Sequence, residues 1–193
     1  MRWHDRRLLA AVRVTAASTK YVAGVFGHRL LVNDDSDLVL DWRNSADVSA
    51  FMFRDDPITA AEHEAWFSGV LVDHPDRRFR MFTVGDAPSG LFSLSMIDTR
   101  HANCVWGGYL APGVPRGAGL GTGMMSVSLS MAFDDLGLHR VTVEAVAHNA
   151  TAIALYEKVG FLREGLLRDR ARQSDGFVDV VLLGLLRSDW VRS

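Results

Sequence analysis

The chain has 193 residues, 48% of them hydrophobic, which is a size and composition typical of one compact domain with a full apolar core. Its formal net charge of −2 and the lack of any dense basic run argue against a nucleic-acid partner. The single cysteine, Cys104, excludes an intramolecular disulfide and favours a reducing compartment such as the cytoplasm. Because Cys104 lies in an apolar segment, we expect it to pack inside a strand rather than to act as a catalytic thiol.

The N-terminal segment 1–27 has early arginines and short apolar runs. Four polar side chains interrupt these runs, namely Arg13, Thr15, Ser18 and Lys20. No signal-peptide core and no membrane span is therefore predicted here. We treat 1–27 as an extension of unassigned role and 28–193 as the domain.

The first third of the domain is predicted to be a strand followed by two helices. The short apolar stretch 28–33 is typical of a strand. A capped helix and then an irregular piece are expected over 36–53. Asp56, Pro57 and Thr59 precede a second helix over 59–73, in which apolar residues recur at helical spacing.

The middle of the chain changes to the period of strands. Segment 78–98 holds two extended runs around a turn rich in Gly, Pro and Ser, and segment 103–112 supplies a third run. Three consecutive strands joined by short turns predict an antiparallel meander.

A glycine-rich loop, "RGAGLGTG" at 116–123, connects this meander to a predicted helix over 120–137 and a strand over 139–148. Strand, loop, helix and strand form a βαβ unit, so the two flanking strands should be parallel. One more helix over 149–160 and extended pieces over 161–172 and 177–186 complete the chain.

Glycines in such a loop let the backbone approach a ligand, and free amides at a helix N-terminus favour an anion such as a pyrophosphate. The spacing matches neither the dinucleotide-binding fingerprint nor a P-loop, which would end in Gly-Lys-Ser/Thr. By itself the loop is equally compatible with an ordinary turn.

The loop and the following helix together resemble the GNAT superfamily of acetyl-CoA-dependent N-acetyltransferases. The matching motifs are Arg116-x-x-Gly119-x-Gly121 and "NATAIALYEKVGF" at 149–161. The resemblance implies an α/β GNAT fold with a central mixed, splayed β-sheet flanked by helices, and acetyl-CoA as cosubstrate. It places the pantetheine arm between the strand at Tyr109 and the strand around Val143. The residues it assigns to acetyl-CoA are Tyr109, Leu110, Arg116, Gly117, Ala118, Gly119, Leu120, Gly121, Thr122 and Asn149.

Acetyl transfer to an amine requires removal of a proton from the amine and stabilisation of the departing thiolate. Tyr156 shares a helical face with Asn149, and the resemblance makes its hydroxyl the proton donor to the thiolate. The alternatives are that Tyr156 only packs in the core and that Asn149 only caps the helix.

Glu144 stands in the predicted strand 139–148, where an unpaired carboxylate would be costly to bury. It precedes Tyr156 by twelve residues (156 − 144), the spacing of the catalytic base in several GNAT enzymes. The resemblance thus implies that Glu144 deprotonates the amine through water, whereas a solvated strand face is the alternative. Backbone amides near Leu110 are the expected oxyanion donors.

The first third, with segments "GLFSLSMID" and "GFVDVVLL", resembles the N-acetyltransferases of pseudaminic acid biosynthesis. These enzymes acetylate the 4-amino group of a UDP-linked amino dideoxy sugar. The resemblance assigns the acceptor substrate to Arg43, His63, Ser93 and Ser95. Met96 stands where a basic residue can occur in that family, so contact with the UDP phosphates is less well supported.

These four side chains also have structural explanations. Arg43 could form a surface ion pair with Asp41 or Asp47, and His63 shares its helical face with apolar residues. Ser93 and Ser95 face the same side of a strand, as residues of a solvent-exposed face would.

Two other functions remain open. A protein Nα-acetyltransferase of the ribosomal-protein type would share the motif at 149–161, although Arg43 and His63 favour the sugar. A non-catalytic acyl-CoA-binding module is disfavoured by Glu144 and Tyr156. We therefore expect a small-molecule amine as partner, with no nucleic acid and no membrane. No metal is expected, because no cluster has ligand spacing. A homodimer through the last strands is implied by family likeness alone.

Overall fold

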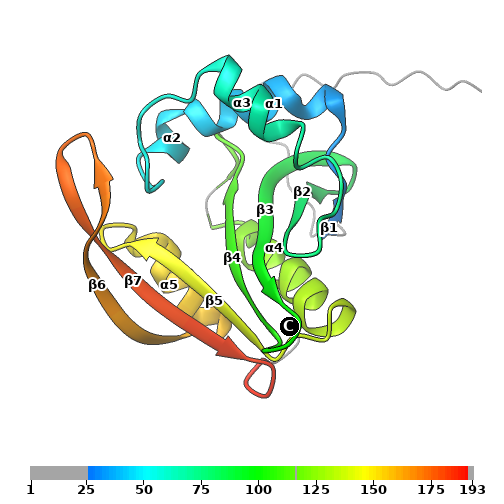
Figure 1. The fold of residues 1–193 in the computed structure, drawn as a ribbon, viewed down its shortest axis with the longest axis vertical. Coiled ribbons are helices and arrows are strands. Elements are labelled where there is room, and N and C mark those ends of the chain that lie inside the picture. Colours follow the sequence, from blue (N-terminus) through cyan, green and yellow to red (C-terminus); the bar gives the residue numbers. More distant parts are fainter. Residues whose placement is uncertain (1–25, 116, 191–193) are drawn as a thin grey trace, which may run out of the picture.

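The computed structural model describes residues 26–115 and 117–190, which form one sheet of seven strands flanked by helices (Figure 1). The strand order is β1-β2-β3-β4-β5-β7-β6, and every neighbouring pair is antiparallel except β4–β5. The strands are β1 (Phe26–Arg29), β2 (Arg78–Val84), β3 (Ala87–Asp98), β4 (Asn103–Leu110), β5 (Arg140–Val146), β6 (Leu162–Gln173) and β7 (Gly176–Leu186). The mixed sheet, the β2–β3–β4 meander and the parallel β4–β5 pair are confirmed.

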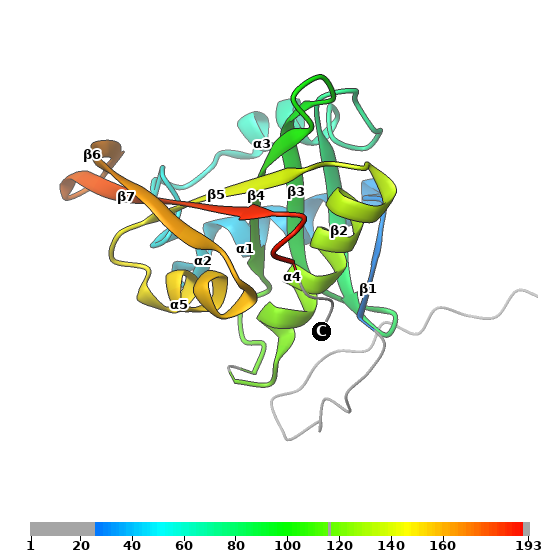
Figure 2. The ribbon, with the colours of Figure 1, turned by 90° about the horizontal axis from the view of Figure 1, so that it is seen from below.

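Helices cover both faces of the sheet. They are α1 (Ser36–Asn44), α2 (Ala46–Ser49), α3 (Ala60–Phe67), α4 (Leu120–Ser130) and α5 (Ala150–Val159). Figure 2 shows α4 and α5 on one side of β5 and β7, where they enclose the larger core cluster. The smaller cluster joins α1 and α3 to the opposite face through Val39, Phe67 and Leu91. Cys104 is buried in the larger core, and burial raises the pKa of its thiol to about 12, as its predicted packing role requires.

Strands β4 and β5 separate partway along their length. They pair only between Asn103–Trp106 and Arg140–Val143, and beyond these residues each strand continues without the other. Figure 1 shows the resulting V-shaped opening between them. The predicted splay is therefore present, and it leaves one edge of β4 open at Gly107–Leu110.

Some predicted boundaries were wrong. The helix expected over 59–73 ends at Phe67. The prediction was too long because the turns at Gly69 and Val70 keep Val70 buried, so the apolar residues continue at nearly helical spacing after the helix ends. The helix expected over 120–137 ends at Ser130 and is extended by the π-helical turn η2 (Met131–Asp135).

At the start of the chain, β1 begins at Phe26 and pairs with β2, so the last two residues of the predicted extension belong to the sheet. A short 3₁₀ turn, η1 (Asn33–Asp35), then leads into α1. Residues 1–25 of the extension lie outside the described part of the chain. Within the described ranges, no helix combines the length and the apolar character that a membrane crossing demands.

Candidate active site

A cavity of about 560 Å³ lies at the β4–β5 opening, between β4 and the first turns of α4 and α5. We call it the donor cavity. Of the residues predicted to bind acetyl-CoA, those that line it are Tyr109, Leu110, Gly117, Gly119, Leu120, Gly121, Thr122 and Asn149. Ala118 is not among the lining residues, and Arg116 lies outside the described residues. Most of the residues predicted to bind acetyl-CoA therefore line one cavity, and their binding role stays a prediction.

The first turn of α4 lines this cavity, and none of the side chains that the structure describes caps its backbone amides. Gly119, its N-cap, has φ +82°, a left-handed conformation that a residue with a side chain rarely adopts. No side chain of the described chain caps the helix, so its first-turn amides keep their hydrogen atoms available. Together with the helix dipole, these amides suit the negative charge of a pyrophosphate. The hydrogen-bond donors at this helix end therefore fit the phosphate part of CoA.

Tyr156 reaches the donor cavity from α5. Its ring is buried and meets Trp106 edge to face, with 5.8 Å between the ring centroids. Burial raises the pKa of the Tyr156 phenol above its usual value. Asn149 caps α5, since its Oδ1 accepts a hydrogen bond from the Ala152 amide at 3.1 Å. It also lines the cavity, so both of its predicted roles are compatible with its position.

A second cavity, of about 460 Å³, lies on the other face of the sheet, beneath α1 and α3. We call it the acceptor cavity. Its aromatic and aliphatic walls include Trp66, Phe79 and Leu91. Met52, Gly108 and Tyr109 line both cavities, so the two spaces meet at these residues. A ligand in each cavity would place its end at this junction.

Arg43 lines the acceptor cavity from α1 and forms no ion pair with Asp41 or Asp47. Its Nη2 donates a hydrogen bond to the carbonyl oxygen of Arg54 at 2.5 Å. Its Nη1 is buried and, among the described residues, has no hydrogen-bond partner. Burial lowers the pKa of the guanidinium, which reflects the cost of desolvating this charge. Arg43 is therefore a cationic residue of the cavity wall with one donor that the described residues leave unsatisfied.

His63 is packed as a core residue and also lies beside the acceptor cavity. It is buried on α3, with its ring centroid 5.2 Å from that of Phe67 and its Nε2 3.2 Å from Ser36 Oγ. It also lines the acceptor cavity. This packing holds His63 as part of the wall.

The two predicted serines differ. Ser93 lines the acceptor cavity from β3. Ser95 lies on the same face, but its hydroxyl donates to the Val105 carbonyl oxygen at 3.3 Å, and it is not among the lining residues. Only Ser93 is therefore placed to touch a ligand in this cavity.

Glu144 lies just beyond the last β4–β5 pair, at the point where the strands separate. Its neighbours Val143 and Ala145 point into the core against α4 and α5, so Glu144 faces the side that carries the acceptor cavity. It is not one of the residues that line either cavity. Its carboxylate is 3.8 Å from the guanidinium of Arg170 on β6. The predicted base therefore lies near the strand separation but outside both cavity walls.

Sequence reasoning missed two residues of the junction. Met52 lies in a segment without periodicity, so no pattern indicated its position. Gly108 had a detectable signal, because a glycine inside a strand often marks a close backbone approach. A Cβ atom at Gly108 would stand 2.8 Å from the Leu91 carbonyl oxygen of β3.

Comparison with known proteins identifies relatives of the whole domain. Residues 28–162 match the family described as Acetyltransferase (GNAT) domain. The chain is 24% identical to spermidine N(1)-acetyltransferase of Vibrio cholerae serotype O1 over 163 residues, covering 84% of this chain and 94% of the relative. It is 31% identical over 101 residues to the Bacillus subtilis protein named "Putative ribosomal N-acetyltransferase YdaF", covering 52% of this chain and 55% of that protein.

The fold is also shared with a solved structure. The spermidine N-acetyltransferase from Vibrio cholerae in complex with CoA and spermine superposes with a TM-score of 0.77 at 23% sequence identity. The match covers 85% of this chain and 96% of that one.

Proposed function

The chain belongs to the GNAT acetyltransferase family, and from this premise we propose that it acetylates a small primary amine whose molecule also carries an anionic group. As a member of this family it is an acetyl-CoA-dependent N-acetyltransferase. The observation that supports the anionic acceptor is the buried, unpartnered Nη1 of Arg43 in the acceptor cavity of the described chain.

Acetyl-CoA, when bound, supplies the acetyl thioester. The first-turn amides of α4 hold its phosphates, and Asn149, Tyr109 and Leu110 hold the arm that leads to the junction. The amine enters from the acceptor cavity on the other face. Because both cavities open at Gly108 and Tyr109, we propose direct transfer within one ternary complex.

Glu144 accepts the amine proton through a water molecule, and the freed nitrogen lone pair attacks the thioester carbonyl carbon. Backbone amides near Leu110 stabilise the negative charge that develops on the carbonyl oxygen. As the carbon–sulfur bond breaks, the Tyr156 hydroxyl donates its proton to the sulfur. The second proton that leaves the acylated nitrogen passes through water to the phenolate and restores Tyr156. The position of Tyr156 among the residues that line the donor cavity supports this role.

The charges of the acceptor cavity guide the choice of acceptor. Its charged lining residues are Arg43, Arg54 and Glu62. Glu62 is already paired with Arg54 at 2.9 Å and also accepts hydrogen bonds from Thr59, so it is not free for a cation. A polycation would meet uncompensated positive charge here, whereas a phosphate or carboxylate would satisfy Arg43.

The UDP-linked amino dideoxy sugar is our specific candidate among anionic amines. It combines a primary amine with phosphates for Arg43 and a sugar ring for Ser93 and the aromatic wall. The comparisons favour a second candidate, a polyamine, since the spermidine acetyltransferase relative is covered over 94% of its length. A peptide N-terminus is a third, supported by the shorter likeness to the ribosomal enzyme.

The test is thiol release from acetyl-CoA with a panel of three amines: a UDP-4-amino-4,6-dideoxy sugar, spermidine, and a peptide with a free N-terminus. We expect turnover with the UDP-sugar and a loss of this turnover in Arg43→Ala. Turnover with spermidine or the peptide alone would leave acetyl transfer intact and overturn the anionic acceptor. Tight CoA binding without turnover on any amine would instead indicate a binding module.

A further inference from the structure

The segment between α2 and α3 forms part of both cavities without having regular secondary structure. We call residues 50–58 the junction loop. Phe51 lines the donor cavity, Arg54 and Ile58 line the acceptor cavity, and Met52 lines both. The position of this loop therefore decides how wide the junction is. A segment without its own hydrogen-bond ladder needs external contacts to keep one position.

Asn44 holds the end of the loop through two hydrogen bonds to the Ile58 backbone, and Arg43 and Glu62 bind Arg54. The contacts to the first half of the loop come largely from the tip of the β6–β7 hairpin, more than a hundred residues later in the chain. Gln173 Nε2 donates hydrogen bonds to the carbonyl oxygens of Met52 at 2.7 Å and Ala50 at 3.3 Å. The backbone amide and hydroxyl of Ser174 donate to the Asp55 carboxylate at 3.0 and 2.7 Å. Figure 1 shows the hairpin tip close to the α2 side of the molecule. The loop is thus held on both sides of Phe53.

Apolar and charged contacts add to this attachment. Phe51 and Phe53 pack against a small cluster formed by Val146, Ala171 and Val180. The Arg170 guanidinium lies 5.9 Å from the centre of the Phe53 ring, within the range of a cation–π contact. The hydrogen bonds from Ser174 lower the pKa of Asp55, which keeps the carboxylate charged and able to accept them.

We infer that the hairpin tip is a clamp that positions the junction loop, and that Gln173 is its positioning residue. Gln173 lines neither cavity, so it acts through the Met52 carbonyl and not on a substrate. Gln173 and Ser174, which form the clamp, lie in the C-terminal hairpin, beyond the range 28–162 that matches the family. This inference rests on the proposed direct transfer at the junction.

Release of the clamp should affect the two cavities differently. The donor cavity keeps its α4 amides and Asn149 when the loop moves, because these contacts do not involve the hairpin. In the acceptor cavity the wall residue released is Met52, whereas Arg54 and Ile58 stay attached to Glu62 and Asn44. Loosening the clamp should therefore weaken acceptor use far more than acetyl-CoA binding.

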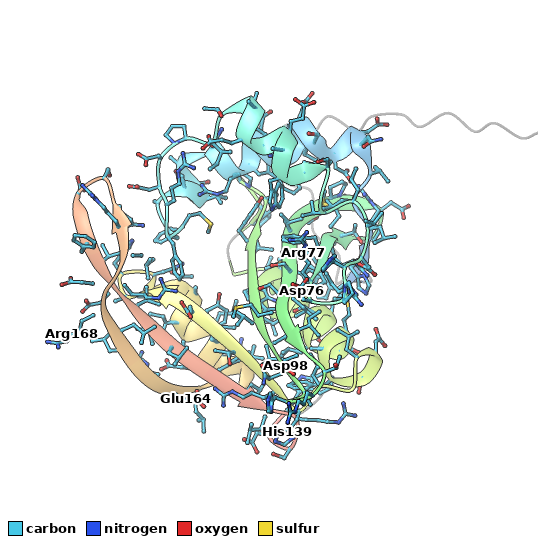
Figure 3. All side chains as sticks on the ribbon, viewed as in Figure 1. Asp76, Arg77, Asp98, His139, Glu164 and Arg168 are labelled. Atoms are coloured by element: carbon cyan, nitrogen blue, oxygen red, sulfur yellow. The ribbon has the colours of Figure 1, made fainter. Side chains whose placement is uncertain are left out.

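The test compares Gln173→Met, which keeps the side-chain size but removes the N–H donors, with Gln173→Lys, which retains donors. Arg168→Ala is the matched control, because Arg168 is exposed on β6 and points away from the body of the molecule in Figure 3. Two readouts are needed: amide hydrogen exchange of residues 50–58, and kcat/KM for the most active amine of the panel together with the Kd of acetyl-CoA.

We expect Gln173→Met to speed exchange in the junction loop and to lower kcat/KM for the amine about tenfold, with the Kd of acetyl-CoA changed less than about twofold. Gln173→Lys should recover part of the loss, and Arg168→Ala should change neither readout. Unchanged exchange in Gln173→Met, or faster exchange with unchanged kcat/KM, would overturn the clamp. Because any amine that turns over serves here, a failure of the anionic acceptor would not be mistaken for a failure of the clamp.

Discussion

The donor and acceptor sides of this site are built in opposite ways. Most residues that line the donor cavity come from one part of the chain, between β4 and α5. The acceptor cavity draws on α1, the junction loop, α3, β3 and β4, and the hairpin at the far end of the chain fastens the loop. A local motif can encode the first, whereas only tertiary folding assembles the second. Substitutions should therefore affect the two sides separately.

The largest effect is expected from Tyr156→Phe, on the donor side. The substitution keeps the ring that packs against Trp106 and removes the proton donor to the thiolate. Turnover should fall by ~10² to 10⁴, the range of general acid catalysis, with acetyl-CoA affinity nearly unchanged. Steady-state kinetics and calorimetric titration of acetyl-CoA measure the two quantities. A kcat within threefold of the wild type would mean that Tyr156 only packs.

Arg43→Ala should act on the acceptor side alone. Loss of a hydrogen bond to a charged group, at about 1.5 to 3 kcal/mol, corresponds to roughly a 10- to 150-fold drop in kcat/KM for an anionic amine. Arg43→Lys should recover only part of it, because an ammonium cannot both bond the Arg54 carbonyl and present a second planar donor. An equal loss in acetyl-CoA affinity would contradict the separation of the two sides.

Gly108→Ala tests the strand that both cavities share. Its new Cβ would stand 2.8 Å from the Leu91 carbonyl oxygen and 3.0 Å from the Trp106 ring, so β3 and β4 must move apart. We expect the free energy of unfolding to fall by about 1 to 3 kcal/mol, as for other overpacked sites. Gly107→Ala is the matched control, because its Cβ would meet only Ser93 Oγ at 3.5 Å. Urea unfolding of both variants decides the point, and equal stabilities would refute the close approach.

The smallest effect concerns pH and the start of α3, which borders only the acceptor cavity. Hydrogen bonds from the Thr59 backbone, Arg54 and the Thr59 hydroxyl lower the pKa of Glu62 to about 2 from 4.5. A depressed pKa gives stability that is present above pH 4.5 and is lost as the pH falls towards 2. The difference in urea midpoint between wild type and Glu62→Gln should therefore shrink across that range. The matched control for removal of one charge is Glu64→Gln, which changes an exposed carboxylate of the same helix and leaves the Thr59 hydrogen bonds in place.

The contrast between the two sides also explains which features could be predicted from the sequence. The βαβ pattern and the motifs at 116–123 and 149–161 correctly predicted the sheet type and the parallel β4–β5 pair. Most of the residues that these motifs assign to acetyl-CoA line one cavity, because their positions depend on glycine conformation and short-range spacing. Arg43, His63 and Ser93, which were predicted to bind the acceptor, line one cavity. Their roles in the reaction, like those of Glu144 and Tyr156, stay predictions.

The rest depended on contacts that no local pattern encodes. Ser95 was expected in the acceptor site, but its hydroxyl is bonded to the neighbouring strand. Met52 and Gln173 come from a loop and a hairpin tip that meet across 121 residues, and neither segment has a period or motif that points to the other. The predicted length of α3 was wrong because apolar spacing continues through a turn after the helix ends.

The central claim is that both cavities are filled at once and that the acetyl group passes directly across the junction at Gly108 and Tyr109. Initial rates measured with acetyl-CoA and the most active amine varied together test this claim. Double-reciprocal lines that intersect are the predicted result, because both substrates must be bound before transfer. Parallel lines, with an acetylated enzyme detectable by mass after acetyl-CoA alone, would contradict it and require a covalent intermediate.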